Sequence, residues 1–165
     1  MLTFVLGGAR SGKSRLAEGL VTRLAPPWTY VATAQAFDEE MRARIAAHVG
    51  RREAGWRTVE APLDLAGALD GVRGPVLVDC LTLWVSNLLL GGRDVGVAGD
   101  GLLAALGRRV GETVVVSNEV GLGIVPDNAL ARAFRDAAGV LHQRVAERAE
   151  RVVLVVAGVA VPVKG

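Results

Sequence analysis

The chain has 165 residues, of which 51% are hydrophobic and 22% are charged, and its net charge is +2. This balance excludes a disordered chain, and the length suits one domain, residues 1–165, with a sizeable core. No apolar stretch reaches the roughly 18 residues that a membrane span needs, and no secretory segment is apparent at the N-terminus. We therefore expect a cytoplasmic protein without membrane insertion.

Two further features of the composition exclude classes of site. The 19 basic residues are spread along the chain among the acidic ones, which argues against a nucleic-acid surface. Cys80 is the single cysteine, so an internal disulfide and a cysteine-based zinc site are excluded.

Apolar runs that predict strands alternate with helical patterns along the chain. In chain order we expect a strand at Leu2–Leu6, a helix at Lys13–Leu24, a strand at Trp28–Ala32, helices at Asp38–Gly50 and Leu63–Leu69, a strand at Pro75–Cys80, a helix at Leu83–Leu90, a glycine-rich surface loop at Gly91–Gly101, a helix at Leu102–Val110, a strand at Thr113–Ser117, a helix at Asn128–Glu150 and a strand at Val152–Val159. Continuous Val and Leu runs predict a mostly parallel sheet with helices on both faces, an α/β three-layer fold. Ligands of such sheets bind at the carboxyl ends of the strands.

The segment after the first expected strand fits the phosphate-loop pattern G-x-x-x-x-G-K-[ST]. Its residues are Gly7, Gly8, Ala9, Arg10, Ser11, Gly12, Lys13 and Ser14. A strand before it and a helix after it distinguish a working loop from a chance match. Backbone amides and the helix N-terminus would surround phosphate oxygens, Lys13 would reach the β- and γ-phosphates, and the Ser14 hydroxyl would bind Mg²⁺. The motif predicts a P-loop NTPase fold that handles a nucleoside triphosphate.

Acidic residues follow two other expected strands. Asp79 ends the run that begins at Pro75, and this position matches the carboxylate that holds Mg²⁺ in P-loop enzymes, although many strands end in an aspartate that caps the next helix. Glu119 lies in a loop with two glycines and a proline, where a substrate hydroxyl or a metal could sit, or where the glycines serve only turns. Spacing alone leaves both alternatives open.

The two histidines differ in their surroundings. His48 lies on an apolar stripe near the end of its expected helix, which by periodicity favours a half-buried structural histidine. Arg51 and Arg52 follow it and could hold phosphates beside an imidazole, which is a competent nucleophile toward phosphorus. His142 has no such neighbours and is expected to be structural or on the surface.

Several stretches, in order along nearly the whole chain, resemble one known family, the bifunctional adenosylcobinamide kinase / adenosylcobinamide-phosphate guanylyltransferases of coenzyme B12 synthesis. These stretches are GGARSGKS (Gly7–Ser14), YVATAQ (Tyr30–Gln35), DEEMRARIAAH (Asp38–His48), WRTVE (Trp56–Glu60), VDCLT (Val78–Thr82), SNEVGLGIVP (Ser117–Pro126) and LARAFRDAAG (Leu130–Gly139). The combination of the first and sixth is far more specific than a phosphate loop alone.

The resemblance implies two reactions and a set of sites. ATP or GTP phosphorylates the aminopropanol hydroxyl of adenosylcobinamide, and GMP then passes from GTP to adenosylcobinamide phosphate, through a GMP–histidine intermediate on His48, to give adenosylcobinamide-GDP. The implied nucleotide contacts are Gly7, Gly8, Ala9, Arg10, Ser11, Gly12, Lys13, Ser14, Ala32, Thr33, Ala34, Val49, Gly50, Arg51, Arg52, Glu60 and Asp79. Lys13 and His48 would be catalytic, Ser14 and Asp79 would hold Mg²⁺, and the base of the kinase step would be Glu119 or Asp79. Known members have a RecA-like parallel sheet and are homo-oligomers that assemble as trimers.

Two other functions compete with this one. A small-molecule kinase without guanylyl transfer would leave His48 structural. A RecA-like ATPase or nucleotide switch would use hydrolysis to drive a partner, but 165 residues leave little room for a partner domain and no basic stripe indicates DNA binding. A covalent GMP label on the protein would exclude both.

Overall fold

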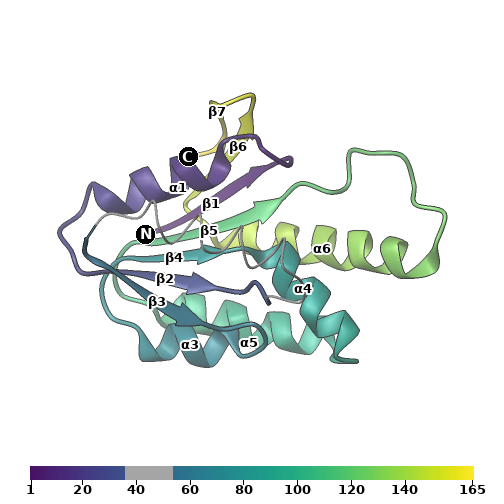
Figure 1. Cartoon of the computed structure of the whole chain (residues 1–165), viewed down its shortest axis with the longest axis horizontal. Helices are drawn as coiled ribbons and strands as arrows, with labels where there is room; N and C mark the ends of the chain where they lie inside the picture. Colours follow the sequence, from purple (N-terminus) through teal and green to yellow (C-terminus); the bar gives the residue numbers. More distant parts are fainter. Residues whose placement is uncertain (36–53) are drawn as a thin grey trace.

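The computed structural model describes residues 1–35 and 54–165 of the chain. Within these ranges seven strands form one sheet in the order β3-β2-β4-β5-β1-β6-β7 (Figure 1). The strands are β1 (Leu2–Gly7), β2 (Trp28–Ala32), β3 (Trp56–Glu60), β4 (Val76–Asp79), β5 (Thr113–Asn118), β6 (Arg151–Val156) and β7 (Val159–Lys164). Every neighbouring pair is parallel except β6 and β7, which confirms the predicted mostly parallel α/β sheet.

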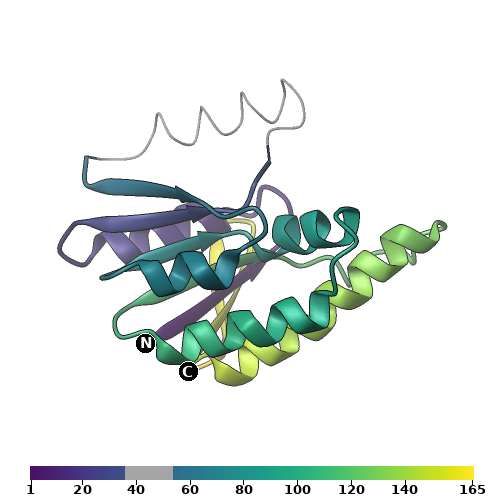
Figure 2. The ribbon, with the colours of Figure 1, turned by 90° about the horizontal axis from the view of Figure 1, so that it is seen from below.

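Described helices cover both faces of the sheet. They are α1 (Lys13–Thr22), α3 (Leu65–Gly71), α4 (Leu81–Leu90), α5 (Val95–Arg108) and α6 (Ala129–Arg148). Helix α1 packs on one face, and α3 to α6 contribute to the core on the other, where α5 and α6 run side by side (Figure 2). Successive residues of β4 serve opposite faces, because Leu77 packs with α1 while Val76 and Val78 pack with the other helices.

Helix α5 begins inside the stretch that was expected to be a loop, so the prediction for Gly91–Gly101 is wrong from Val95 onward. The side chain of Asp94 caps the helix by accepting a hydrogen bond from the Val97 N–H at 2.9 Å. Each glycine costs a helix interior about 1 kcal/mol relative to alanine, but burial of Leu102, a fully buried residue, and its neighbours outweighs that cost.

The sequence predicts one strand at Val152–Val159, but the structure has two strands there, β6 and β7. Ala157 and Gly158 have positive φ values of 51° and 82°, and the chain reverses there into the antiparallel strand β7. A two-residue turn with both residues in this region is the turn that fits the twist of a hairpin. The expected strand therefore ends early and a further one follows.

Strand β3 was not expected at all. Among the described strands it lies at the edge of the sheet and pairs with β2 alone, and most of its residues are exposed. An edge strand needs no continuous apolar run, and so WRTVE carries no strong strand pattern. Among the described residues, no helix is long and apolar enough to cross a membrane.

The two-sided core yields a matched test of stability. Leu77 on β4 is completely buried, whereas Leu90 at the end of α4 is 65% exposed. We expect Leu77→Ala to lower the free energy of unfolding by about 2–5 kcal/mol through lost burial and a residual cavity. Leu90→Ala should change it by less than about 0.5 kcal/mol. Urea unfolding of both variants checks this, and equal losses would contradict the described core.

Candidate active site

The carboxyl ends of five neighbouring strands are aligned at one edge of the sheet. Gly7 of β1 lies opposite Asn118 of β5, and Ala32 of β2 lies opposite both Asp79 of β4 and Glu60 of β3. Neighbouring strands lie about 4.8 Å apart, so these five ends span about 19 Å. The phosphate loop and the acidic strand ends are therefore within reach of one extended ligand.

The phosphate loop joins β1 to α1 and holds two residues in the left-handed region, Arg10 with φ 56° and Gly12 with φ 95°. The ammonium of Lys13 donates a hydrogen bond to the Gly8 carbonyl at 3.1 Å, and Lys13 is only 9% exposed. The buried hydroxyl of Ser11 has no partner among the described residues. A buried lysine turned back onto its own loop, beside an unpartnered hydroxyl, fits a cradle for a phosphate group.

The turn between β6 and β7 supports this loop from the other side. The Gly158 N–H donates a hydrogen bond to the Ser11 carbonyl at 2.8 Å. A Cβ atom on Gly12 would lie 3.3 Å from the Gly158 Cα, which is a tight contact. Glycine is thus required at Gly12 both by its positive φ and by the close approach of the hairpin.

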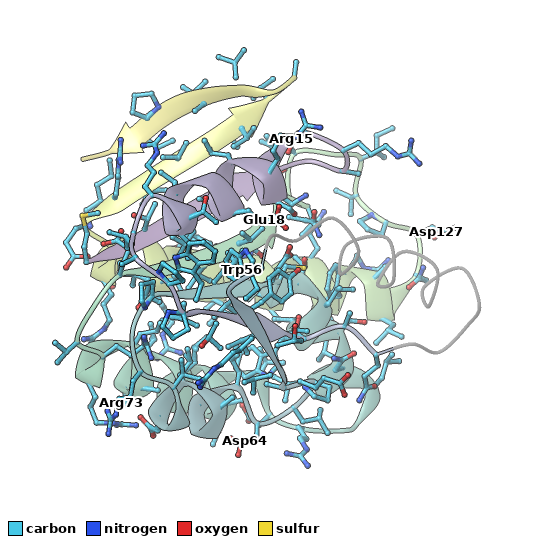
Figure 3. The ribbon with its side chains drawn as sticks, turned by 60° about the vertical axis from the view of Figure 1, so that its left-hand side comes forward. Arg15, Glu18, Trp56, Asp64, Arg73 and Asp127 are labelled. Carbon is cyan, nitrogen blue, oxygen red and sulfur yellow. The ribbon has the colours of Figure 1, made fainter. Side chains whose placement is uncertain are left out.

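Asp79 is half-buried at the end of β4 and accepts a hydrogen bond from the Tyr30 hydroxyl, with 3.0 Å between the oxygens. The ring of Tyr30 packs edge-on against that of Trp56, whose ring centroid also lies 5.6 Å from that of Trp28. Trp56 is labelled near the middle of the view in Figure 3. Helix α1 packs across β1, β5 and β4, which brings its start, with Lys13, toward the Asp79 edge. The aromatic cluster holds this carboxylate in place.

The neighbouring Cys80 is a buried, unreactive thiol. Burial, followed by the negative charge of Asp79, raises its pKa to about 11, while Thr82 and Lys13 oppose the shift. Its sulfur lies 3.3 Å from the Thr82 hydroxyl, which also accepts a hydrogen bond from the Asn118 side chain at 2.8 Å. Because a protonated thiol is a poor nucleophile, Cys80 serves as a residue of the core.

Thr33, in the turn after β2, uses all its polar groups inside the protein. Its hydroxyl donates to the Cys80 carbonyl at 2.7 Å and accepts from the Cys80 N–H at 2.8 Å, and its own N–H donates to the Asp79 carbonyl. Its carbonyl accepts from Asn87 at 2.8 Å. Thr33 is completely buried. Direct contact with a ligand at this turn would fall to Ala32 and Ala34, which are half-buried.

Glu119 follows β5 and organises its own loop. Its backbone N–H donates to the Gly7 carbonyl at 3.1 Å, and its carboxylate accepts the N–H groups of Gly121 at 2.6 Å and Leu122 at 3.1 Å. These contacts place a half-buried carboxylate beside the phosphate loop while it serves a turn. Both alternatives raised by the sequence for Glu119 fit this position.

His142 is not an isolated surface residue. Its Nε2 lies 2.7 Å from the Ser117 hydroxyl at the end of β5, and its ring centroid lies 5.6 Å from that of Phe4. Burial lowers its pKa to about 4, against the opposing charge of Glu119. The partners come from distant segments, so no local pattern in the sequence could have indicated this pair.

Lowering the pH should reduce the free energy of unfolding, because His142 is held neutral in the folded protein. Its folded pKa lies below the ordinary value near 6.5, so the unfolded chain binds more protons between about pH 6.5 and 4, and stability falls as the pH falls through that window. We expect a loss of about 2 kcal/mol between pH 8 and pH 5. Urea unfolding of the wild type and His142→Asn at both pH values measures it. An equal pH dependence in the two proteins would refute the assignment.

Some of the expected site residues lie outside the described residues, namely His48, Val49, Gly50, Arg51 and Arg52, together with the expected Asp38–Gly50 helix. Of the remaining ones, Glu60 is exposed at the end of β3, and the phosphate loop, Ala32–Ala34 and Asp79 share the carboxyl edge. The sequence reasoning missed Tyr30 and Asn87, whose roles depend on contacts across the fold.

Comparison with known proteins identifies relatives over the full length. The family described as "Cobinamide kinase / cobinamide phosphate guanyltransferase" matches residues 3–163. The "Bifunctional adenosylcobalamin biosynthesis protein CobP" of Pseudomonas aeruginosa is 52% identical, covering 100% of this chain and 98% of that protein. The "Bifunctional adenosylcobalamin biosynthesis protein CobU" of Salmonella typhimurium is 44% identical, and that of Escherichia coli is 41% identical; each comparison covers 99% of this chain and 100% of the relative.

Solved structures support the fold class. The flagellar accessory protein FlaH of Methanocaldococcus jannaschii superimposes with a TM-score of 0.50 at 12% identity, over 99% of this chain and 77% of that one. An ATPase from the type III secretion system of pathogenic bacteria gives a TM-score of 0.54 at 12% identity, over 93% of this chain and 50% of that one. The α/β P-loop fold predicted from the sequence is confirmed.

Proposed function

Since this chain belongs to the cobinamide kinase / cobinamide phosphate guanyltransferase family and is a bifunctional enzyme of adenosylcobalamin biosynthesis, we propose that one edge of its sheet serves both reactions. The observation that carries this proposal is the phosphate loop, where Lys13 bonds to Gly8 and the Ser11 hydroxyl lacks a partner within the described ranges. A single domain, residues 1–165, would hold both activities.

In the kinase reaction, ATP or GTP binds with its phosphates on Gly7–Ser14. Lys13 leaves the Gly8 carbonyl and contacts the β- and γ-phosphates, and the loop amides hold the remaining charge. The aminopropanol hydroxyl of adenosylcobinamide attacks the γ-phosphorus, and the bond to the β-phosphate oxygen breaks. Asp79 and Glu119 remain the two candidates for accepting the hydroxyl proton, because both carboxylates lie at this edge.

In the guanylyl reaction, His48 attacks the α-phosphorus of GTP and pyrophosphate leaves. A phosphate oxygen of adenosylcobinamide phosphate then attacks that phosphorus, the phosphorus–nitrogen bond breaks, and the imidazole is regenerated with adenosylcobinamide-GDP as product. Support for the other nucleotide contacts, Ala32, Thr33, Ala34, Val49, Gly50, Arg51, Arg52, Glu60 and Asp79, comes from the family resemblance and, for the described ones, from their place at the strand ends. Thr33 would act by shaping its turn.

We also propose Mg²⁺ at Ser14 and Asp79. Within the described residues no three His, Cys, Asp or Glu side chains cluster, which suits an ion that takes most ligands from phosphates and water. The half-buried Asp79 carboxylate, fixed by Tyr30, offers the hard oxygen that Mg²⁺ prefers. When bound, the ion would neutralise charge on the transferring phosphate.

A homo-oligomer, with a trimer as the specific expectation, is supported by exposed apolar side chains in the described part of the chain. Ile124, in the loop after β5, is 99% exposed, and four valines of β6 and β7 are also exposed, namely Val156, Val159, Val161 and Val163. We also propose a cytoplasmic location for the protein, because its nucleotide substrates are found there.

Guanylyl transfer through His48 is tested with α-labelled GTP. We expect wild type to retain acid-labile label after denaturation and His48→Ala to retain none, because a phosphorus–nitrogen bond survives denaturation and breaks in acid, and only the variant lacks this imidazole. His142→Asn serves as the matched histidine control and should label like wild type. If wild type folds and binds GTP but carries no label, the covalent mechanism is refuted. A kinase in which His48 is structural would then be favoured.

Lys13 offers a second test, because Lys164 is the only other lysine of the chain. We expect Lys13→Ala to lower kcat of the kinase reaction by about 10²–10³-fold, the usual loss when one donor to developing charge is removed. Lys164 lies on β7 and bonds to the end of α6 through the Ala146 and Glu147 carbonyls, so Lys164→Ala should keep its rate. Steady-state kinase kinetics decide, and a Lys13→Ala enzyme with the wild-type rate would contradict the proposed role.

A further inference from the structure

Asn87 is a buried amide at the junction of two strand ends. It lies on α4, is 7% exposed, and donates through Nδ2 to the Thr33 carbonyl at 2.8 Å and to the Pro62 carbonyl at 3.0 Å. Thr33 follows β2 and Pro62 follows β3. One side chain thus supplies both of its amide hydrogens to the loops that leave two adjacent strands.

The two loops contain proposed nucleotide contacts. Ala32 and Ala34 flank Thr33, and Glu60 ends the strand that leads to Pro62. A further hydrogen bond, from the Ala61 N–H to the Ala32 carbonyl at 2.8 Å, completes the join. The strand ends themselves are paired, Ala32 with Glu60, and beyond that pair the turn and the loop after β3 are joined by Asn87 and by that one backbone contact.

Asn87 makes no such contact with the phosphate loop. Strand β2 is separated from β1 by β4 and β5, which places its end about 14 Å from the end of β1. The loop has its own supports, namely the Lys13 bond to Gly8 and the Gly158 bond to Ser11. The Asn87 junction and the phosphate loop are thus held by separate sets of interactions.

We propose that Asn87 is a positioning residue for guanylyl transfer, which it serves by fixing the Ala32–Ala34 turn against the Glu60 strand end. The inference rests on the proposed nucleotide contacts at these two segments, and it does not depend on His48 being the nucleophile. Removal of the two donors leaves the buried Thr33 carbonyl and the partly buried Pro62 carbonyl without these partners, so the loops separate or rearrange. The guanylyl site changes shape while the phosphate loop is retained.

The experiment compares both reactions of the complete enzyme in the same variants. Asn87→Asp keeps the shape of the side chain but replaces the donors with acceptors, and Asn87→Leu is the second variant should Asn87→Asp fail to fold. We expect the KM for GTP in guanylyl transfer to rise about tenfold or more, as two unsatisfied acceptors imply. The KM for ATP in the kinase reaction should stay within about twofold of wild type, a change of under half a kcal/mol.

Trp84→Phe is the matched control. Trp84 lies on the same helix and its Nε1 donates to the Leu63 carbonyl at 2.9 Å, one residue beyond Pro62, rather than to the Thr33 turn. The control loses a buried hydrogen bond from α4 to the same loop, so it measures the effect of general destabilisation. We expect Trp84→Phe to change neither the KM for GTP in guanylyl transfer nor the KM for ATP in the kinase reaction relative to wild type.

Three results would overturn the proposal: an equal loss of both reactions in the Asn87 variants, no loss in either, or the same selective loss in Trp84→Phe. Failure of the histidine mechanism would appear separately. Wild type would then form adenosylcobinamide-GDP without a covalent label, while the selective effect of Asn87→Asp on the KM for GTP would persist.

Discussion

The hydrogen bonds of Thr33 join three parts of the carboxyl edge, because one residue of the β2 turn bonds to the end of β4 and to α4 at once. Parallel strands align their ends only as a consequence of register, and loops beyond the last ladder bond are free to diverge. A buried threonine with every polar atom satisfied removes that freedom at the centre of the edge. The alignment of the β2 turn with Asp79 and with α4 depends on these bonds.

Support for the phosphate loop comes from a different source. Arg10 adopts a left-handed backbone conformation that costs a non-glycine residue about 1–2 kcal/mol, and Lys13 is largely removed from water. Such costs persist only where surrounding contacts hold the conformation in place, and here the β6–β7 turn supplies one at Ser11. The protein keeps a shape that suits bound phosphate before any ligand arrives.

Much of this architecture could be predicted from local sequence. Strands β1, β2, β4 and β5 are apolar runs, and the phosphate loop has a spacing that follows from the geometry of its amides. The edge strand β3 could not be predicted from burial, and the start of α5 depended on the cap at Asp94 rather than on the glycines after it. Asn87 meets Thr33 across 54 positions of sequence, and the partners of His142 are equally remote, so a single chain carries no pattern for either.

The bond between Gly158 and Ser11 has a consequence for how the protein is made. The nucleotide-binding motif leaves the ribosome well before the hairpin that satisfies one of its carbonyls, because more than a hundred positions separate the two segments. Strand β1 likewise lies between β5 and β6, both of which follow it by more than a hundred positions. Contacts of such long range form slowly, because the intervening chain must be ordered first. A nascent chain therefore completes the support of this loop only after the β6–β7 hairpin has been synthesised and has packed against it.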